Sequence, residues 1–349
     1  MKRNSIFILF FLLLAACTTR QQEIPSSPWQ EADEQTECFD LPQIEQAGEL
    51  IALTLSGPDT YYDYMGRHLG VHYMLVQQFA DHLGVRLRVE LCRDTTEVLA
   101  RLQSGDADLA FLRLEPDTLT AGWRVGQGKT ELASALNAWY NPSMMGQAKQ
   151  LEQELLSRKR VARRVSAPML SRGVISHYDG LFKRYSRTIG WDWRLIAAQC
   201  YQESTFDPEA ESWAGARGLM QIMPSTADHL GLPRDQMTDP EHNVEAAVRL
   251  LGELERNFDY INDRTERQNF VLASYNGGFF HVQDAQRLSA RDGHDMSRWE
   301  EVKPYILKLS QPQYYQDTLV HYGYMRGSET ADYVDRIRQR YQQYKRSVR

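Results

Sequence analysis

The chain has 349 residues, of which 42% are apolar and 25% are charged, a composition typical of globular domains. Its length predicts two domains, since one hydrophobic core rarely grows beyond a few hundred residues. The formal net charge of -6 provides no basic excess to neutralise phosphates, and the sequence has neither a zinc-type cysteine and histidine spacing nor a phosphate-binding glycine loop. We therefore expect no nucleic acid partner, no metal and no cofactor.

The N-terminus has the pattern of an export signal. Lys2 and Arg3 precede an apolar run over residues 6–14, which is too short to cross a bilayer as a stable helix. The run ends with small residues immediately before Cys17, and this arrangement resembles the lipobox of bacterial lipoproteins, whose cysteine is lipidated and becomes the mature N-terminus. We expect residues 1–16 to be a signal peptide and Cys17 to carry a lipid anchor; the alternative is a plain signal peptide with an incidental cysteine.

The residues after the anchor indicate location and tethering. Thr18 is not the aspartate that favours inner-membrane retention of enterobacterial lipoproteins, so we expect an outer-membrane protein that faces the periplasm. Residues 17–43 are polar and lack the apolar side chains needed to order themselves, which predicts a tether. Cys38 and Cys92 could form a disulfide in an oxidising periplasm, and the sequence does not decide whether they do. Cys200 falls on an apolar helical stripe and is expected in the core.

Residues 44–146 alternate between strand and helix patterns, which predicts an α/β lobe. Strands are expected at 50–55, 85–91, 107–111 and 122–126, and helices at 74–83, 95–103 and 131–139. This order, with the phrase from Leu102 to Leu109, resembles the first lobe of periplasmic solute-binding proteins. Only about ten residues separate Phe111 from Gly122, too few for a second βαβ lobe. We expect a truncated lobe that either binds a muropeptide or peptide ligand or has a regulatory or structural role.

Residues 147–175 are rich in Gln, Glu and Arg and include a basic run over 158–164, which predicts a solvated helix followed by a linker. The alternative for this segment is a patch that faces membrane or glycan phosphates. From residue 176 to 349 the apolar periodicity is helical throughout and predicts an all-α domain. Its expected helices are 178–189, 193–203, 225–230, 240–258, 266–274 and 331–344. The predicted fold class is therefore α+β with two domains.

One predicted helix places a carboxylate on an apolar face. Asp192 is a plausible N-cap for it, and a helical wheel aligns Trp193, Ile196, Cys200 and Glu203 on one stripe. Glu203 is therefore expected to be partly buried, which raises a carboxyl pKa toward neutrality and suits a general acid for glycosidic cleavage. Taken alone, the stripe would favour the simpler interpretation of a buried glutamate that an arginine satisfies.

Four motifs follow one another in the C-terminal half, and they are Glu203-Ser204-Thr205-Phe206, residues 215–224 (GARGLMQIMP), Ser274-Tyr275-Asn276-Gly277-Gly278 and residues 327–334 (GSETADYV). Together they resemble the soluble-lytic-transglycosylase family of lysozyme-like folds over roughly residues 178–344. With the upstream lobe and the lipobox, the whole chain resembles the membrane-bound lytic murein transglycosylase F type, with its solute-binding-like part cut short.

The resemblance implies a mechanism with one catalytic residue. Glu203 would protonate the oxygen between N-acetylmuramic acid and N-acetylglucosamine in peptidoglycan and then deprotonate the muramyl 6-hydroxyl, which closes a 1,6-anhydro ring in cell-wall remodelling and turnover. The N-acetyl group of the substrate replaces the second carboxylate of ordinary glycosidases. The family positions that bind the glycan correspond to Ser212, Gln221, Tyr275, Asn276, Tyr333 and Glu329. Asp207 lies past the helix end and is not expected to act as a second catalytic carboxylate.

Two other functions remain open from the sequence. A lysozyme-like hydrolase on the same helical fold would need a second carboxylate to handle water. A non-catalytic lipoprotein that senses cell-wall fragments would not need the set of Glu203, Ser212, Gln221 and Tyr275 to be intact. The presence of all four residues favours an enzyme over a sensor.

Overall fold

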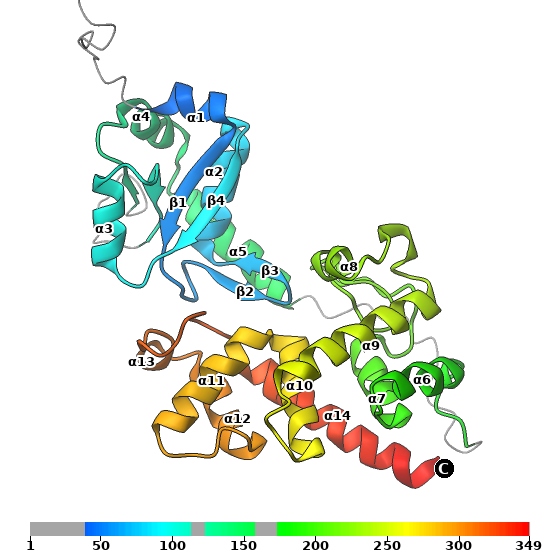
Figure 1. Cartoon of the computed structure of the whole chain (residues 1–349). Coiled ribbons are helices and arrows are strands. Elements are labelled where there is room, and N and C mark those ends of the chain that lie inside the picture. Colours follow the sequence, from blue (N-terminus) through cyan, green and yellow to red (C-terminus); the bar gives the residue numbers. More distant parts are fainter. Residues whose placement is uncertain (1–38, 113–122, 158–172, 349) are drawn as a thin grey trace, which may run out of the picture. The chain divides into compact units, whose positions relative to one another are not determined.

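The structure, a computed structural model, describes residues 39–112, 123–157 and 173–348. The predicted signal peptide, Cys17, Cys38, most of the tether and the basic run lie outside these ranges. The fold is mixed α+β and mostly helical (Figure 1). Its two largest hydrophobic clusters are formed by different parts of the sequence. We call the part that contains the first cluster the N-terminal α/β region (39–157) and the part that contains the second the C-terminal helical region (173–348). None of the described helices has the length and hydropathy that a membrane span requires.

A four-stranded sheet forms the centre of the N-terminal α/β region. Its strands are β1 (Glu49–Thr54), β4 (Arg86–Leu91), β5 (Leu109–Ala110) and β6 (Arg124–Val125), in the order β4-β1-β5-β6 (Figure 1). β1 pairs in parallel with both β4 and β5, and β6 closes one edge antiparallel to β5. Parallel neighbours require crossover connections, so this topology confirms the predicted βαβ order.

Helices cover both faces of the sheet, and they are α1 (Leu41–Ala47), α2 (Val71–Leu83), α3 (Thr95–Gln103), α4 (Thr130–Trp139) and α5 (Ser143–Ser157). Leu50 and Ala52 of β1 pack with α2, α4 and α5, whereas Leu53 packs with α3 on the opposite face. Side chains alternate in this way because successive Cβ atoms of a strand point to opposite faces. β1 is a continuous apolar run because both of its faces are buried.

The structure contains a hairpin that the sequence analysis does not predict. β2 (Tyr62–Tyr64) and β3 (Arg67–Leu69) pair antiparallel, and the turn between them holds Met65 and Gly66 at φ 49° and 74°. Each strand has three residues, too few to show the alternation over four or more residues that identifies a strand in sequence.

The helix α5 (Ser143–Ser157) overlaps the start of the segment 147–175, for which a solvated helix and a linker are expected. Ala148 joins the core of the N-terminal α/β region, and Glu152 is 8% exposed. The Glu152 carboxylate accepts the Tyr62 hydroxyl (3.0 Å) and the backbone N–H of Gly70 (3.1 Å), and burial raises the pKa of Glu152 above its usual value. The expected helix is therefore present and most of its residues are exposed, but Ala148 and Glu152 are buried and anchor it to the N-terminal α/β region.

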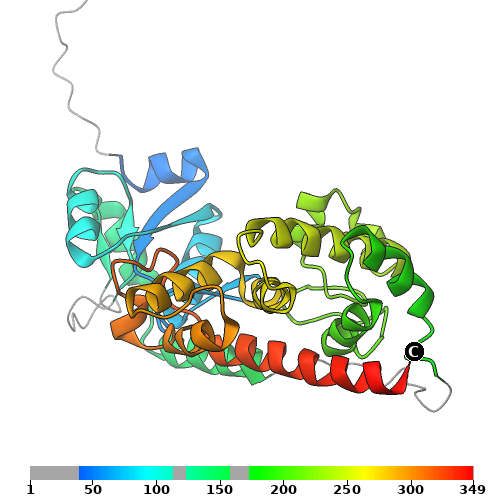
Figure 2. The ribbon, with the colours of Figure 1, turned by 60° about the horizontal axis from the view of Figure 1, so that its bottom comes forward.

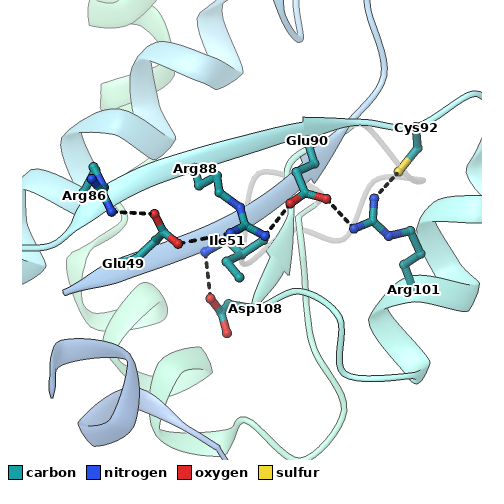
Figure 3. A network of polar contacts seen from close by, with 8 residues as sticks. All are labelled: Glu49, Ile51, Arg86, Arg88, Glu90, Cys92, Arg101 and Asp108. Carbon is teal, nitrogen blue, oxygen red and sulfur yellow. Dashed lines mark hydrogen bonds and ion pairs between the residues drawn. The ribbon is translucent and has the colours of Figure 1, made fainter. Parts of the chain in front are cut away.

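Charged side chains form a ladder along β1 and β4 (Figure 3). Glu49 pairs with Arg86 at 3.0 Å and with Arg88 at 3.3 Å, and Arg88 also contacts Glu90 at 2.6 Å. The arginines of these pairs are 79% and 49% exposed, and exposed pairs contribute about 0–1 kcal/mol each. The ladder therefore adds little to stability.

Asp108 forms a different kind of pair, because it is buried. Its Oδ2 accepts the backbone N–H of Ile51 at 2.7 Å (Figure 3), and its Oδ1 lies 3.0 Å from Nζ of Lys129. Both charged side chains are only 5% exposed, and Lys129 also donates to the carbonyl of Phe39. This pair joins the approach to β5, the strand β1 and the start of α4.

The C-terminal helical region has no strand among residues 173–348, as the predicted all-α domain requires. The helix α10 (Arg264–Gly277) packs against α9, α11, α12 and α14, and Figure 2 shows α14 in red as the longest helix of the region. The other helices are α6 (Asp179–Tyr185), α7 (Trp193–Ser204), α8 (Pro224–Leu230), α9 (Pro240–Asn257), α11 (Phe279–Arg291), α12 (Trp299–Lys308), α13 (Pro312–Tyr315) and α14 (Gly327–Ser347). The sequence analysis misses α11, α12 and α13.

Replacement of Asp108 tests the buried pair. Asp108→Asn should lower the free energy of unfolding by about 3 kcal/mol or more, because the Lys129 ammonium is then buried without its counter-charge. Urea unfolding followed by circular dichroism measures this change. Arg86→Ala is the matched control, since its exposed pair with Glu49 is worth about 1 kcal/mol or less. Equal losses in the two variants would contradict a structural role for the buried pair.

Candidate active site

The end of α7 carries the predicted catalytic glutamate. The Asp192 carboxylate accepts the backbone N–H of Arg194 at 2.9 Å and caps the helix, as the sequence predicts. Glu203 lies in the last turn and is 3% exposed, so its expected burial is confirmed. The expected single apolar stripe is too narrow, because residues on other faces, such as Leu195 and Gln199, are also buried. The helix packs against both α6 and α14, which explains this wider burial.

The chain turns sharply where α7 ends. Thr205 and Phe206 have left-handed backbone conformations, with φ 54° and 64°. The Ser204 hydroxyl donates to the carbonyl of Leu219 at 2.8 Å, and the Cys200 thiol lies 3.4 Å from the same oxygen. Burial raises the pKa of the Cys200 thiol well above its usual value, so this thiol stays protonated. These contacts bind the end of α7 to a loop that is distant in sequence.

That loop, residues 212–223, is also fixed by α9. Asn243 is fully buried, and its Oδ1 accepts the backbone N–H of Met220 at 2.8 Å. Its Nδ2 donates to the carbonyls of Arg217 at 3.0 Å and of Met237 at 2.7 Å. The sequence analysis misses Asn243, because a polar residue within an amphipathic helix gives no local sign of a distant partner.

Tyr333 of α14 reaches the candidate catalytic carboxylate. Its hydroxyl donates to Oε1 of Glu203 at 2.6 Å, and the Tyr333 side chain is 4% exposed. Burial raises the pKa of Tyr333 well above its usual value, and the nearby Glu203 acts in the same direction. Tyr333 is therefore a neutral donor that orients the carboxylate from the wall opposite α7.

Gln221 and Tyr275 both donate to backbone carbonyls in or next to the 212–223 loop. Nε2 of Gln221 donates to the carbonyls of Ala210 and Gly218, each at 3.0 Å. The Tyr275 hydroxyl donates to the carbonyl of Met220 at 2.8 Å. The structure therefore shows both side chains supporting the loop, while their predicted contacts with a glycan stay predictions.

A cavity of about 410 Å³ lies beside these groups and collects four of the predicted binding residues, namely Ser212, Asn276, Glu329 and Tyr333. Glu203, Gln221 and Tyr275 are not among its lining residues, and Glu203 adjoins the cavity through its hydrogen bond with Tyr333. Tyr275 and Asn276 lie in the last turn of α10, so the expectation that they follow the helix is wrong. The helix continues to Gly277, which packs so closely against Met325 and Thr330 that an added Cβ would lie 2.3 Å from a Met325 atom.

The polar groups of the cavity have partners within the chain. The Ser212 Oγ accepts the backbone N–H of Ala216 at 3.0 Å. The Thr330 hydroxyl donates to Oδ1 of Asn276 at 2.8 Å. The Glu329 carboxylate accepts the hydroxyl of Tyr64, in β2, at 2.6 Å. A ligand in this cavity therefore meets groups that are already oriented.

The cavity is also lined by residues that the sequence analysis does not single out, namely Tyr64, Met65, Leu156, Gln202, Trp213, Asp332 and Arg336. The last two share one face of α14 with Glu329 and Tyr333, since positions three, four and seven residues apart are neighbours on a helix. This spacing could have identified Asp332 and Arg336 from the sequence. Asp207 lies outside the lining and accepts the backbone N–H of Glu209 at 3.0 Å. In the part of the chain that the structure describes, no cluster of three His, Cys, Asp or Glu side chains could hold a metal.

Comparison with known proteins identifies the helical region. Residues 180–296 match the family model described as the transglycosylase SLT domain. The chain is 43% identical over 163 residues to the membrane-bound lytic murein transglycosylase F of Desulfosudis oleivorans, an alignment that covers 47% of this chain and 35% of the relative. It is 35% identical over 254 residues to the protein of that name from Vibrio campbellii, covering 71% of this chain and 46% of the relative. The resemblance expected from the motifs is thus confirmed.

The alignments cover less than half the length of each of these two relatives. The protein of the same name from Citrobacter koseri aligns over 97% of this chain and 86% of its own length at 27% identity. The solved structure of the 70 kDa soluble lytic transglycosylase of Escherichia coli covers 63% of this chain and 31% of its own, with 23% identity and a TM-score of 0.33. A TM-score of this size does not define a shared fold.

Gly218 tests how the loop is held beside Glu203. Its φ is +81°, and an added Cβ would lie 2.4 Å from the carbonyl oxygen of Met237 and 2.5 Å from Nδ2 of Asn243. Gly218→Ala should lower the free energy of unfolding by about 3 kcal/mol or more, the sum of left-handed strain and overpacking. The control is Gly231→Ala, which has a similar φ of +67° and open space around the Cβ, and should cost about 1–2 kcal/mol. Thermal unfolding of both variants measures the two losses of stability. An equal loss in Gly231→Ala would show that left-handed backbone strain alone, and not overpacking against Met237 and Asn243, destabilises Gly218→Ala.

Proposed function

We propose that this chain is a peptidoglycan lytic transglycosylase whose catalytic residue is Glu203. One observation carries the proposal. Glu203 is buried, it is oriented by the Tyr333 hydroxyl, and Tyr333 lines a cavity with Ser212 and Asn276. Relatives named membrane-bound lytic murein transglycosylase F support the same activity.

The reaction requires one group that gives and then takes a proton. Glu203 protonates the glycosidic oxygen as the bond from C1 of N-acetylmuramic acid to O4 of N-acetylglucosamine breaks. The N-acetyl oxygen of the muramyl unit stabilises the positive charge at C1, in place of a second carboxylate. Glu203 then removes the proton of the 6-hydroxyl as O6 bonds to C1. The product is a 1,6-anhydro sugar, and no water is consumed.

A hydrolase is the second candidate, and one observation favours it. Glu329 and Asp332 line the same cavity as Tyr333, so a second carboxylate is at hand to activate water. Against this, the carboxylate of Glu329 accepts the Tyr64 hydroxyl through both oxygens, at 2.7 and 2.6 Å. The Asp332 carboxylate lies 3.4 Å from the Arg336 guanidinium, so both carboxylates already have partners within the chain. We therefore favour the transglycosylase reaction.

We infer a specific fold type for each of the two regions. The C-terminal helical region is a lysozyme-like domain, which the SLT match over residues 180–296 supports. The N-terminal α/β region is half of a solute-binding-like lobe pair. The Citrobacter koseri alignment spans 458 positions, more than the 349 residues of this chain, so a long stretch of the relative has no counterpart here. This gap supports a missing second lobe, and a muropeptide or peptide ligand for the remaining half stays part of the proposal.

We also propose that Cys17 anchors the protein by lipid in the outer membrane, facing the periplasm. The support is the lipobox-like sequence before Cys17 together with Thr18 after it, and the relatives are named membrane-bound. In this position the C-terminal helical region would meet peptidoglycan strands from the membrane side. The tether would be shorter than residues 17–43, because Asp40 caps α1 and α1 begins at Leu41.

Substitution of Glu203 tests the proposed chemistry. Glu203→Gln should slow cleavage of purified sacculi by about 10²- to 10⁴-fold, because it removes the proton donor while the amide keeps a similar size and polarity. Mass spectrometry of the wild-type digest should find 1,6-anhydro ends. The control is Asp207→Asn, a buried carboxylate outside the cavity, which should cleave at the wild-type rate. Reducing ends alone would assign the site to a hydrolase instead.

The anchor is tested in cells. Cys17→Ser should move the protein from the outer-membrane fraction to the soluble periplasmic fraction, because serine cannot receive the thioether-linked lipid. Fractionation with immunoblotting measures this, and purified Cys17→Ser protein should retain cleavage of sacculi. Persistence of the variant in the outer-membrane fraction would contradict lipidation at this residue.

A further inference from the structure

Two aromatic side chains stack on each other at an exposed position. Phe280, in the first turn of α11, and Tyr322 have ring centroids 4.2 Å apart and planes inclined by 6°. Their exposed fractions are 48% and 41%. Exposed apolar area of this size is unfavourable in water, and a ligand that covers it recovers that free energy.

Buried charges hold the pair in place. Asp284 is fully buried, and its carboxylate accepts the backbone N–H groups of His321 at 3.0 Å and of Tyr322 at 2.8 Å. Arg287 pairs with the same carboxylate and donates through Nε to the carbonyl of Leu319 at 2.9 Å. The segment that carries Tyr322 is therefore fixed to α11, so the stacked rings are organised before any ligand arrives.

The stacked pair lines a second cavity that adjoins the first. This cavity has a volume of about 440 Å³, and Asn276 and Glu329 line both cavities. His281 also lines it, is 6% exposed, and its Nδ1 has no hydrogen-bond partner among the described residues. Burial lowers the pKa of His281 below its usual value, so the imidazole is uncharged at neutral pH.

We propose that Phe280 and Tyr322 form a sugar subsite, which takes one pyranose of a glycan strand beyond the units held beside Glu203. This inference rests on the proposed function and adds to it a binding position. The C–H groups on the flat face of a pyranose pack well on an aromatic ring, whose face carries partial negative charge. The shared Asn276 makes the second cavity a continuation of the first, so a strand that occupies one extends into the other.

Charge also favours a neutral ligand. Within the second cavity, Arg326 lies 3.7 Å from the Glu329 carboxylate, so these opposite charges face each other. Asp63 and His68, which lie 2.5 Å apart, also line this cavity together with the aromatic pair and the uncharged His281. An uncharged N-acetylglucosamine unit leaves these pairs unchanged, whereas the lactyl carboxylate of a muramyl unit or the ionised groups of a stem peptide would meet the carboxylates of Asp63 and Glu329.

The test measures binding without cleavage. The full chain carrying Glu203→Gln is titrated by calorimetry with glycan strands stripped of their stem peptides, in a short fraction that fills only the first cavity and a long fraction that reaches the aromatic pair. Adding Tyr322→Ala should weaken binding of the long strands by about 3- to 10-fold and leave the short strands unchanged. Phe280→Ala should act in the same way.

Two controls separate stacking from general damage. Tyr322→Phe keeps the ring and should bind long strands like its parent. Tyr260→Ala removes a tyrosine that is 48% exposed and lines neither cavity, and it should also have no effect. Equal binding of long strands by Tyr322→Ala and its parent would overturn the subsite, as would a loss seen only with strands that retain stem peptides. If the parent bound neither fraction, the proposed function would fail and the subsite with it.

Discussion

The hydrogen bond between Tyr333 and Glu203 is the interaction on which the C-terminal helical region is organised. A carboxyl group that is 3% exposed needs a hydrogen-bond partner whether or not it is protonated, because an unsatisfied buried polar group is unfavourable. The partner comes from α14, far along the chain, so α14 must lie against α7. Val334 and Ile337 of α14 are buried in the same core. The contact that orients the candidate catalytic group is thus part of the packing that stabilises the domain.

The same logic explains the loop of residues 212–223. Its backbone turns through positive φ at Gly218 and Gln221, a conformation that leaves buried backbone groups without regular secondary structure to satisfy them. Side chains from three helices supply the partners: Ser204 from α7, Asn243 from α9 and Tyr275 from α10. A loop fixed from three sides forms a rigid wall, and rigid walls position substrates better than mobile ones.

Sequence reasoning succeeded where the signal is local. Asp94 and Asp192 cap the starts of α3 and α7, and both helices begin where the sequence predicts. It failed where partners are distant: the three-residue strands of the β2–β3 hairpin lack periodicity, and Asn243 is defined only by the loop that it binds. The helical wheel found Glu203 but described a one-sided helix, since it could not include the α6 and α14 packing that buries the remaining faces.

The N-terminal α/β region completes a hydrophobic core with its own strands and helices. If the region is half of a lobe pair, as proposed above, the second lobe would be inserted between β5 and β6, which only residues 111–123 join in this chain. Asp108 stands on one side of this short connection and Lys129 on the other, and their buried pair holds the two sides together. The backbone N–H of Gly126 also donates to the carbonyl of Asp108 at 2.7 Å. Because both faces of β1 are buried by helices of the same region, the sheet completes its core without further strands.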